Sequence, residues 1–276
     1  MKFNLVYKIV NNCIKKYIHL LFFVVRYLMN SIKVEPKYNS NINPRIGLIA
    51  LASDIIIEKD FLRILKNQNI DFFVNRIEIY NPLTSENLIK MSQKITDVTK
   101  DILPDQKIDC VVYGCTSGTI AAGYKEIEKK IHLAKPEAKV STPSTAAIKA
   151  LKKLKIKKIA VFTPYAKDLN NEVIEFFKKE NFNITSNSYF DIKNDTDIGK
   201  VDPEHLYEVL SQMNLEEADA LFVSCTALPV LQIIDRLEKK FNKPVLSSNQ
   251  ALIWDTLEKI GKNTSINGFG KLFLIN

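Results

Sequence analysis

The chain has 276 residues, 46% hydrophobic and 25% charged, which is typical of a globular protein with length for one large domain or two modest ones. Its four cysteines (Cys13, Cys110, Cys115 and Cys225) follow neither a disulfide framework nor a CxxC metal pattern, and its three histidines are far apart in sequence. These spacings disfavour a disulfide-stabilised fold and a histidine-based metal site, and they indicate free thiols in a reducing, cytoplasmic compartment. The net charge of +8 is concentrated in residues 1–40, which hold seven basic residues and one acidic residue. Because the remainder is nearly neutral and has no basic stripe, we expect no nucleic-acid binding.

The N-terminal region contains the apolar run "YIHLLFFVV" at residues 17–25, closed on each side by a basic residue. This run is too short to cross a membrane, which takes about 20 residues, and no small-residue cleavage site follows it. Three interpretations stay open: a basic amphipathic helix lying on a membrane or a partner, an uncleaved weak anchor, or a translation start at Met29. We favour a dispensable extension over residues 1–40, so membrane contact is possible but is not the preferred interpretation. The segment "NSNINP" at 39–44 is predicted to be a linker.

From residue 45 onward, short apolar runs alternate with segments of helical periodicity. Apolar strands of this length between helices predict parallel sheets that are covered on both faces. The predicted strands are 45–51, 71–79, 109–114, 139–142, 157–163, 183–190, 219–225 and 244–248. The predicted helices lie near 58–67, 85–103, 119–133, 143–154, 167–180, 203–213, 230–241 and 250–260.

Two stretches place a Cys-Thr pair in the same local setting. "VVYGCTSGTIAAG" (111–123) and "LFVSCTALPVLQ" (221–232) each put a cysteine after an apolar strand and before hydroxyl side chains. The segments downstream, "KVSTPSTAAIKALKKLKIKK" and "PVLSSNQALIWDTLEKIGKN", also resemble each other. Open parallel sheets bind ligands at the carboxyl ends of their strands. A duplicated α/β unit would therefore bring Cys115 and Cys225 into one cleft between two domains.

Residues 45–273 resemble the aspartate/glutamate racemase superfamily, in its branch of maleate isomerases, arylmalonate decarboxylases and ectoine-utilisation racemase-like proteins. The matching motifs are "RIGLIAL", "GCTSGT", "STPSTAA", "FTPYAKDLNNEV", "VSCTALPV", "KPVLSSNQALIW" and "GFGKLF". The ectoine-utilisation branch is the most similar, through "GLIALASD…EKDF" and "IYNPLTSENL". The resemblance implies an α/β fold of two pseudosymmetric parallel-sheet domains with the active site between them. We expect a first domain over 41–145, joined by the C-terminal helix 249–276, and a second domain over 146–248.

The chemistry of such a site can be argued from the residues. Removing a proton next to a carboxylate creates a dianionic enolate, so the site needs a base, an opposing acid and donors for the developing charge. A cysteine can be either base or acid when a helix N-terminus lowers its pKa, and we predict Cys115 and Cys225 to be the catalytic pair. Thr116 and Ser117 are predicted at the cap of the next helix, and Thr226 is predicted in the same position after the second cysteine. Their hydroxyls would hold a substrate carboxylate, although such residues are most often only caps.

Three further residues enter through the resemblance. Tyr165, in "TPY", matches a phenolic donor to the substrate, and Asn170 matches a family position in the following helix. Where maleate isomerases have "SSN", this chain has Ser53 and Asp54. A carboxylate there would repel a second substrate carboxylate and favour an ammonium or amidinium group, unless Asp54 only caps the next helix. The presence of Cys115 argues against decarboxylation, because the decarboxylases keep only the second thiol.

We therefore predict a cofactor-independent racemase or isomerase that acts at a carbon next to a carboxylate, in ectoine or amino-acid catabolism. The alternatives are a maleate cis-trans isomerase and a small-molecule binding protein without catalysis. Neither a metal nor an organic cofactor is expected, because the sequence has no ligand cluster and no Gly-rich phosphate loop. The expected partner is a small carboxylate-bearing substrate, and we expect a homo-oligomer.

Overall fold

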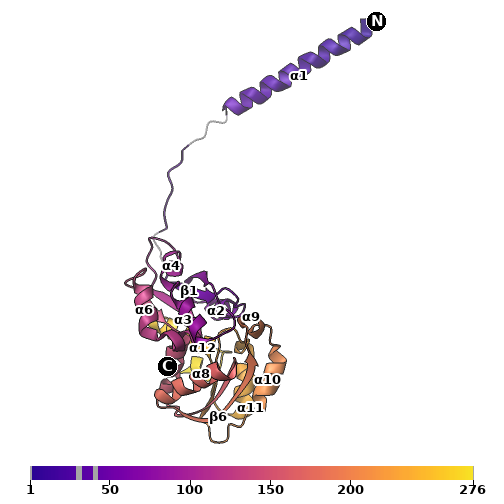
Figure 1. The fold of residues 1–276 in the computed structure, drawn as a ribbon. Coiled ribbons are helices and arrows are strands. Elements are labelled where there is room, and N and C mark those ends of the chain that lie inside the picture. The colour runs from indigo at the N-terminus through magenta and orange to yellow at the C-terminus, as the bar shows by residue number, and fades with distance from the viewer. Residues whose placement is uncertain (1, 29–32, 40–42, 276) are drawn as a thin grey trace. The chain divides into compact units, whose positions relative to one another are not determined.

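The computed structural model describes residues 2–28, 33–39 and 43–275, and the chain divides into two compact units, residues 1–42 and 43–276 (Figure 1). In the first unit, α1 (Lys2–Leu28) is one helix without an acidic residue. None of the helices in the described parts of the chain is long and apolar enough to cross a membrane. The alternative start at Met29 and part of the predicted linker lie outside the described residues, and contact of α1 with a membrane or a partner stays a prediction.

The second unit contains two parallel four-stranded sheets with the same strand order. The first sheet runs β2-β1-β3-β4 and the second runs β6-β5-β7-β8, so the second half of the unit repeats the topology of the first. This confirms the predicted α/β fold of two pseudosymmetric parallel sheets. The strands are β1 Arg45–Leu51, β2 Asp71–Ile77, β3 Cys110–Gly114, β4 Lys139–Ser141, β5 Lys158–Tyr165, β6 Asn183–Ile192, β7 Ala220–Val223 and β8 Val245–Ser247. The helices are α2 Ile57–Leu65, α3 Ser85–Ser92, α4 Ile95–Lys100, α5 Thr116–Ala122, α6 Tyr124–His132, α7 Pro143–Lys153, α8 Lys167–Lys179, α9 Asp195–Ile198, α10 Pro203–Ser211, α11 Ile234–Phe241 and α12 Ser248–Lys259, with 3-10 turns η1 Leu231–Ile233 and η2 Lys271–Leu274.

The central strands form the core of each half. Nearly every side chain of β1, β3, β5 and β7 is buried, because helices cover both faces of a parallel sheet. The central pairs have equivalent registers, with Ile46 beside Cys110 in the first sheet and Ile159 beside Ala220 in the second. The edge strand β6 is largely exposed. The two central loops that carry cysteines therefore leave equivalent strands at equivalent ends.

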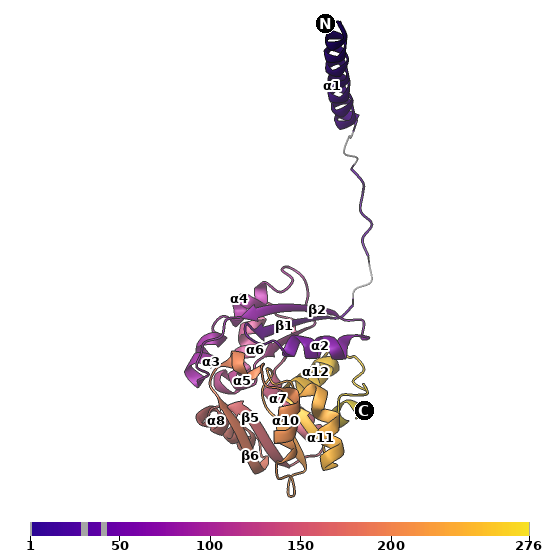
Figure 2. The ribbon, with the colours of Figure 1, turned by 90° about the vertical axis from the view of Figure 1, so that its right-hand side faces the viewer.

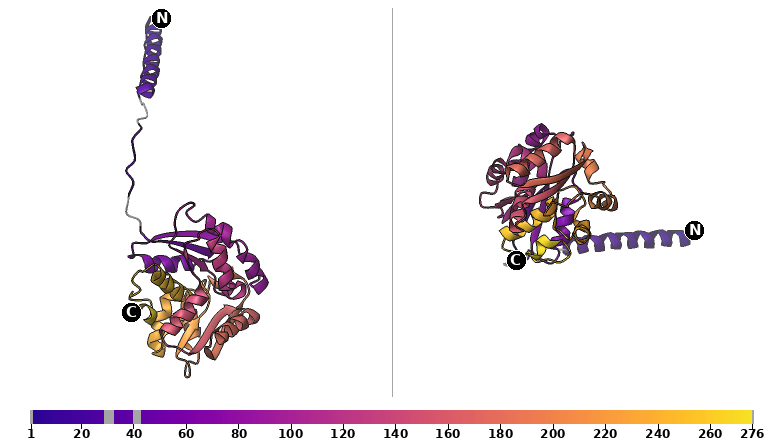
Figure 3. Two further views of the ribbon diagram at one scale, coloured as in Figure 1. Left: turned by 90° about the vertical axis from the view of Figure 1, so that its left-hand side faces the viewer. Right: turned by 90° about the horizontal axis from the view of Figure 1, so that it is seen from below.

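The two halves meet through helices. In Figure 2, α7 and α12 lie between the sheet of β1 and β2 and the sheet of β5 and β6, and Figure 3 shows the two halves from the opposite side. Helix α12 packs against α7 and α2 and also contacts β3, β4 and β8, so it touches both halves. The predicted domain boundaries stay a prediction.

Two predicted helices are each divided in the structure. The segment 85–103 forms α3 and α4, and the segment 119–133 forms α5 and α6. The second break has a clear cause, since Gly123 at the end of α5 has φ of +82°, a left-handed conformation that glycine adopts without strain. Helix α5 also begins earlier than predicted, at Thr116 directly after Cys115.

Candidate active site

Both cysteine loops are buried and contact each other. Cys115 follows the last residue of β3 and is 3% exposed, and Cys225 lies two residues beyond β7 and is 4% exposed. The Thr226 hydroxyl donates to the carbonyl oxygen of Gly114 at 3.2 Å, which links the loop of one half to the strand end of the other. The structure thus brings together the carboxyl ends of β3 and β7.

One serine hydroxyl joins both loops. Ser248, the first residue of α12, accepts a hydrogen bond from the Thr116 hydroxyl at 2.9 Å and another from the Cys225 backbone N–H at 3.0 Å. All three residues are buried. The N-terminus of α12 therefore fixes the positions of the two cysteine loops relative to each other. Sequence reasoning missed Ser248, although it lies in the quoted motif "KPVLSSNQALIW".

Cys115 is itself the N-cap of α5. Its Sγ accepts the backbone N–H of Gly118 at 3.2 Å, and the Ser117 Oγ lies 3.9 Å from the same sulfur. The prediction that Thr116 and Ser117 form the cap is therefore wrong: they are the first helical residues, because the thiol takes the N–H that a cap would take. Burial raises the pKa of Cys115 to about 12, and the Gly118 N–H and the Ser117 hydroxyl act in the opposite direction.

The second glycine of "GCTSGT", Gly118, is required because the atoms of two neighbouring side chains lie close to its backbone. A Cβ on Gly118 would lie 2.8 Å from Cys115 Sγ and 2.8 Å from the Tyr113 hydroxyl oxygen. The Tyr113 hydroxyl is buried beside Cys115 and has no hydrogen-bond partner among the described residues. This unpartnered phenol was not predicted, because a tyrosine inside an apolar strand resembles a core residue.

Cys225 has a strained backbone. Its φ of +107° is unfavourable for any residue with a side chain, and such strain often occurs at functional sites. Burial raises its pKa well above the usual value, whereas the Tyr165 hydroxyl and the Ala227 N–H lower it. No helix begins at Thr226, which lies in a turn, so the prediction that Thr226 follows the pattern of the first loop is wrong. The two thiols nevertheless share one arrangement, since each is near one backbone N–H and one hydroxyl.

Tyr165 and Asn170 occupy different surroundings. Tyr165 ends β5, is buried, and lies near both cysteines, with its hydroxyl close to Cys225 and to Ser117. Asn170 is buried in α8, and its Oδ1 accepts the Thr163 hydroxyl at 2.9 Å. Tyr165 is thus part of the cysteine cluster, and Asn170 supports the end of β5.

Asp54 binds the backbone where α2 begins, which is close to the capping role of its alternative interpretation, although the N-cap residue itself is Ile56. Its Oδ1 accepts the N–H groups of Ile56 at 2.8 Å and Ile57 at 2.9 Å, where α2 begins. Its Oδ2 is buried and has no hydrogen-bond partner in the described part of the chain. Burial raises the pKa of this carboxyl group, while the two backbone N–H groups and the nearby Thr226 hydroxyl lower it.

A second buried carboxyl group comes from the other half of the unit. Asp195, the first residue of α9, accepts a hydrogen bond from the Ser53 hydroxyl, and burial raises its pKa to about 6. Asp195 and Asp54 both raise the pKa values of the two cysteines, so ionisation of these carboxyl groups disfavours both thiolates. Nothing in "DIKNDTDIGK" distinguished Asp195 from its acidic neighbours, which are typical of an exposed loop.

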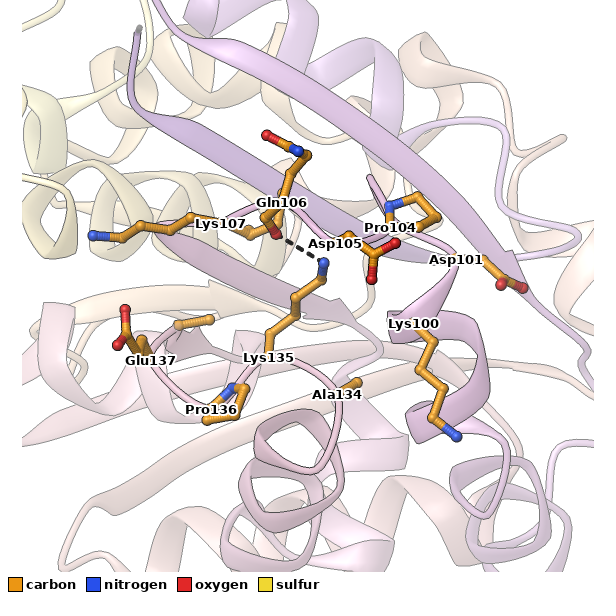
Figure 4. A pocket seen from close by; sticks show the side chains of 12 residues that line it. Lys100, Asp101, Pro104, Asp105, Gln106, Lys107, Ala134, Lys135, Pro136 and Glu137 are labelled. Carbon is orange, nitrogen blue, oxygen red and sulfur yellow. Dashed lines mark hydrogen bonds between the residues drawn. The ribbon is translucent and has the colours of Figure 1, made fainter.

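A hollow elsewhere on the molecule does not belong to this site. It has a volume of about 640 Å³ and lies where the chain enters β3 and β4, at the end of the sheet opposite to the cysteines (Figure 4). Lys135 extends into it and donates to the carbonyl oxygens of Leu103 and Gln106, each at 2.9 Å. Its ammonium group therefore stabilises the surrounding loops. Across the described residues, no group of three or more His, Cys, Asp or Glu side chains is placed to hold a metal.

A duplicated parallel α/β unit with a thiol after one equivalent central strand of each half, β3 and β7, has the arrangement expected of a two-cysteine α/β enzyme. The family model described as arylmalonate decarboxylase matches residues 121–273, more than half of the chain, and the chain belongs to this family. The predicted resemblance is therefore confirmed at the level of this branch of the superfamily.

The relatives include enzymes of two activities. A maleate isomerase of Geobacillus stearothermophilus is 27% identical over 243 residues, which cover 83% of this chain and 96% of that protein. The arylmalonate decarboxylase of Bordetella bronchiseptica is 27% identical over 136 residues, covering 48% of this chain and 57% of that protein. A solved structure of a Pseudomonas putida maleate isomerase with maleate has a TM-score of 0.79 at 22% identity, covering 85% of this chain and 98% of that one. The predicted enzyme class, an isomerase, is confirmed by these relatives.

Proposed function

We propose that this enzyme transfers a proton at a carbon next to the carboxylate of a small substrate, with Cys115 and Cys225 as the catalytic pair. The observation that carries the proposal is the matched setting of the two thiols. Each leaves the equivalent strand of its half, and each is near one backbone N–H and one hydroxyl that favour its thiolate. Ser248 holds both loops. Two equivalent groups of this kind suit a reaction in which one removes a proton and the other supplies one.

The hydroxyls around the thiols divide into two groups. Those of Thr116 and Thr226 donate to Ser248 and to the Gly114 carbonyl oxygen, so they hold the loops. Those of Ser117 and Tyr165 remain directed at the cysteine cluster, and each can donate its single proton either to its thiolate or, once a substrate is bound, to the substrate carboxylate. We therefore assign substrate binding to Ser117 and Tyr165 and loop positioning to Thr116, Thr226 and, through β5, Asn170. Donors placed where an enolate gains charge lower the barrier to its formation.

In the racemase or epimerase mechanism, the thiolate of one cysteine removes the proton from the substrate carbon. The electron pair of the C–H bond moves into the carboxylate as an enolate, and the thiol of the other cysteine returns a proton from the opposite face. The reaction ends with the charges of the two sulfurs exchanged. It needs no cofactor, because the carboxylate itself accepts the electrons.

Cis-trans isomerisation of maleate is the second candidate, and the relatives favour it. A Nocardia farcinica maleate cis-trans isomerase has been solved with a covalently bound succinylcysteine intermediate, at 21% identity and a TM-score of 0.78, covering 84% of this chain and 99% of that one. In this chain, Cys115 would add to the double bond and Cys225 would supply the proton, so that rotation could occur before elimination. A role in ectoine or amino-acid catabolism belongs to the first candidate.

Incubation in deuterium oxide separates the two candidates. The enzyme is mixed with amino acids, ectoines and dicarboxylates, and the protons next to each carboxylate are followed by NMR. Proton transfer by two thiols places solvent deuterium on that carbon of the true substrate. Conversion of maleate to fumarate with its original hydrogens retained would instead support addition and elimination. If folded enzyme neither exchanges nor isomerises any compound of the panel, the proposal is contradicted.

A further inference from the structure

Besides the unpartnered hydroxyls of Tyr113 and Ser224, two buried oxygen atoms of carboxylate and amide groups near the cysteine loops lack a donor among the described residues. One is Oδ2 of Asp54, and the other is Oδ1 of Asn249, the second residue of α12. The Asn249 amide nitrogen donates to Asp60 Oδ2 at 2.9 Å and to the Thr226 carbonyl oxygen at 2.7 Å, which fixes the orientation of the amide group. Its oxygen is therefore left as an acceptor only. Buried polar atoms without a partner are rare in folded proteins and require an explanation.

Thr226 connects both residues to the loop of the second thiol. Its carbonyl oxygen binds Asn249, its hydroxyl lies near the Asp54 carboxylate, and it directly follows Cys225. Although the Thr226 hydroxyl is close enough to lower the pKa of Asp54, its hydrogen bond goes to the Gly114 carbonyl oxygen, so Asp54 Oδ2 is left without a donor. The two acceptors thus belong to the same site as the thiols.

The charged side chains that act on the two sulfurs have one sign. Asp54 and Asp195 both act on both thiols, and no lysine or arginine is among the main influences on either sulfur. The charge of Arg76 lowers the pKa of Asp54, but its guanidinium is held by other acceptors: it donates to the carbonyl oxygens of Leu51 at 3.0 Å and Asp54 at 2.8 Å and pairs with Glu58 at 2.7 Å. A second substrate carboxylate would be repelled here, whereas a cation with N–H groups would be attracted.

We infer that this site binds a substrate that carries, besides its carboxylate, an ammonium or amidinium group held by Asp54 Oδ2 and Asn249 Oδ1. The substrate class is therefore a zwitterion, an amino acid or a cyclic amidine carboxylate, rather than a dicarboxylate. This inference rests on the proposed function, since it names the substrate of the same site. It also explains how buried thiols can ionise, because a bound cation offsets the two carboxylates.

Four-carbon acids that differ in one group test the inference by equilibrium binding to the full chain. The probes are 2-aminobutyrate and 4-aminobutyrate, with one ammonium group each, butyrate without a second charge, and succinate with a second carboxylate. Isothermal titration should show at least one aminobutyrate binding about tenfold or more tightly than butyrate, as one charge-assisted contact provides, and succinate binding more weakly than butyrate. Succinate binding as tightly as either aminobutyrate would overturn the inference.

The Asp54→Asn variant tests whether Asp54 causes the preference for a cationic substrate. The amide oxygen of the new side chain can keep the two bonds to the start of α2, while its NH2 group replaces the free acceptor with a donor. Affinity for the aminobutyrate should therefore fall about tenfold, and affinity for succinate should rise. The control is Asp202→Asn, because Asp202 is exposed and caps α10 in the same way, with Oδ1 accepting the N–H groups of Glu204 and His205 at 2.9 Å each. An Asp54→Asn variant with unchanged affinities would contradict the inference and would identify Asp54 as a cap or a protonated donor. Binding and deuterium exchange are separate measurements: a dicarboxylate that binds and exchanges would refute the inference but not the proposed function.

Discussion

The two candidate catalytic cysteines are each near one backbone N–H and one hydroxyl, but their backbone conformations differ. Cys115 is in the extended conformation with φ of −144°, whereas Cys225 has φ of +107°. The first is held by the helix that it caps, and the second is held by its N–H bond to Ser248. A different hydrogen bond therefore fixes the position of each cysteine.

We predict that Cys115→Ser and Cys225→Ser each lower kcat by at least about three orders of magnitude, because paired catalytic groups act as a unit. The double variant should lose little beyond either single one for the same reason. Rates of deuterium exchange measure the effect, and thermal melting checks that the variants fold. Near-normal turnover by either serine variant on the true substrate would rule out the two-thiol mechanism.

Gly118→Ala should lower activity through the geometry of Cys115. The new Cβ would lie 2.8 Å from the Cys115 sulfur, so the thiol must move, and a displacement of this kind costs about a hundredfold in kcat. Gly47→Ala is the matched control, because its Cβ would lie 2.9 Å from an Ile102 methyl group in the apolar core of the first sheet. Both variants should lose about 1–3 kcal/mol of stability by overpacking, but only Gly118→Ala should lose activity. Equal activity of the two variants would show that the cysteine tolerates displacement.

At the scale of elements, the N-terminus of α12 organises the site. A capping box between Ser247 and Gln250 fixes where the helix begins. The first two residues of the helix, Ser248 and Asn249, contact both cysteine loops and α2. Asn249 connects α12 to Asp60 of α2. One helix of the second half of the sequence thus positions residues from both halves.

The Ser248→Ala variant tests this role. It leaves the Cys225 N–H and the Thr116 hydroxyl buried without their acceptor, at a cost of about 1–3 kcal/mol, and we expect kcat to fall more than KM rises. Ser144→Ala is the control, since Ser144 is buried near the start of α7 and its hydroxyl has no partner among the described residues. Chemical denaturation and steady-state kinetics of both variants measure the effects. If Ser248→Ala has a kcat as high as Ser144→Ala, Ser248 does not position the cysteine loops for catalysis.

The carboxyl group of Asp60 should make stability depend on pH. Burial raises its pKa in the folded state from 3.8 to about 7, so the folded state binds more protons than the unfolded state between these values. The contribution of this carboxyl group to the free energy of unfolding is therefore greatest below about pH 4 and is lost as the pH rises to 7. The upper limit of this loss is about 4 kcal/mol. Asp60→Asn should remove this loss, so its stability relative to the native chain should increase from pH 4 to pH 7 in urea titrations.

Asp219→Asn provides a control of opposite sign. The pKa of Asp219 is lowered mainly by its bonds to the N–H groups of Lys158 and Lys157, so its contribution is present at neutral pH and is lost as the pH falls. This variant should be less stable than the native chain at pH 7 and nearly equal to it at low pH. The same pH trend for Asp60→Asn would contradict a raised pKa at Asp60.

At the scale of the whole molecule, residues 43–276 hold the core, the cysteine cluster and the contacts that enclose it. Several contacts connect segments of the first half with segments of the second. Ser53 donates to Asp195, Ser85 donates to Glu172 at 2.5 Å, and the Leu83 N–H donates to the Lys193 carbonyl oxygen at 2.9 Å. Since both cysteines are buried, we expect substrate entry to require a movement between the two halves.

A chain that begins at Met29 should keep the activity and melting temperature of the full chain, because the core residues lie beyond residue 45. Activity measured by deuterium exchange and cosedimentation with anionic vesicles should be compared for both chains. Loss of vesicle binding with full activity would assign the extension to membrane contact. A large loss of activity on truncation would contradict the view that the extension is dispensable.

The sequence by itself determined the repeated strand-helix order and the placement of Cys115 and Cys225 at equivalent strand ends. These are local properties, since apolar runs and turn residues indicate strands wherever the chain carries them. The sequence also indicated that Asp54 could hold the start of the next helix, and its two bonds there agree with this, although Ile56 is the N-cap residue of α2.

Only the tertiary structure brought Ser248, Asn249 and Asp195 to the cysteines, because each is far from them in the chain and acts through contacts between elements. It also decided that Cys115 caps its own helix and that Thr226 does not begin one, since these depend on which donor reaches which acceptor. The unpartnered oxygens of Asp54 and Asn249 belong to the same category: burial without a donor is a property of the packed molecule. Periodicity describes one element at a time, whereas a site depends on how several elements meet.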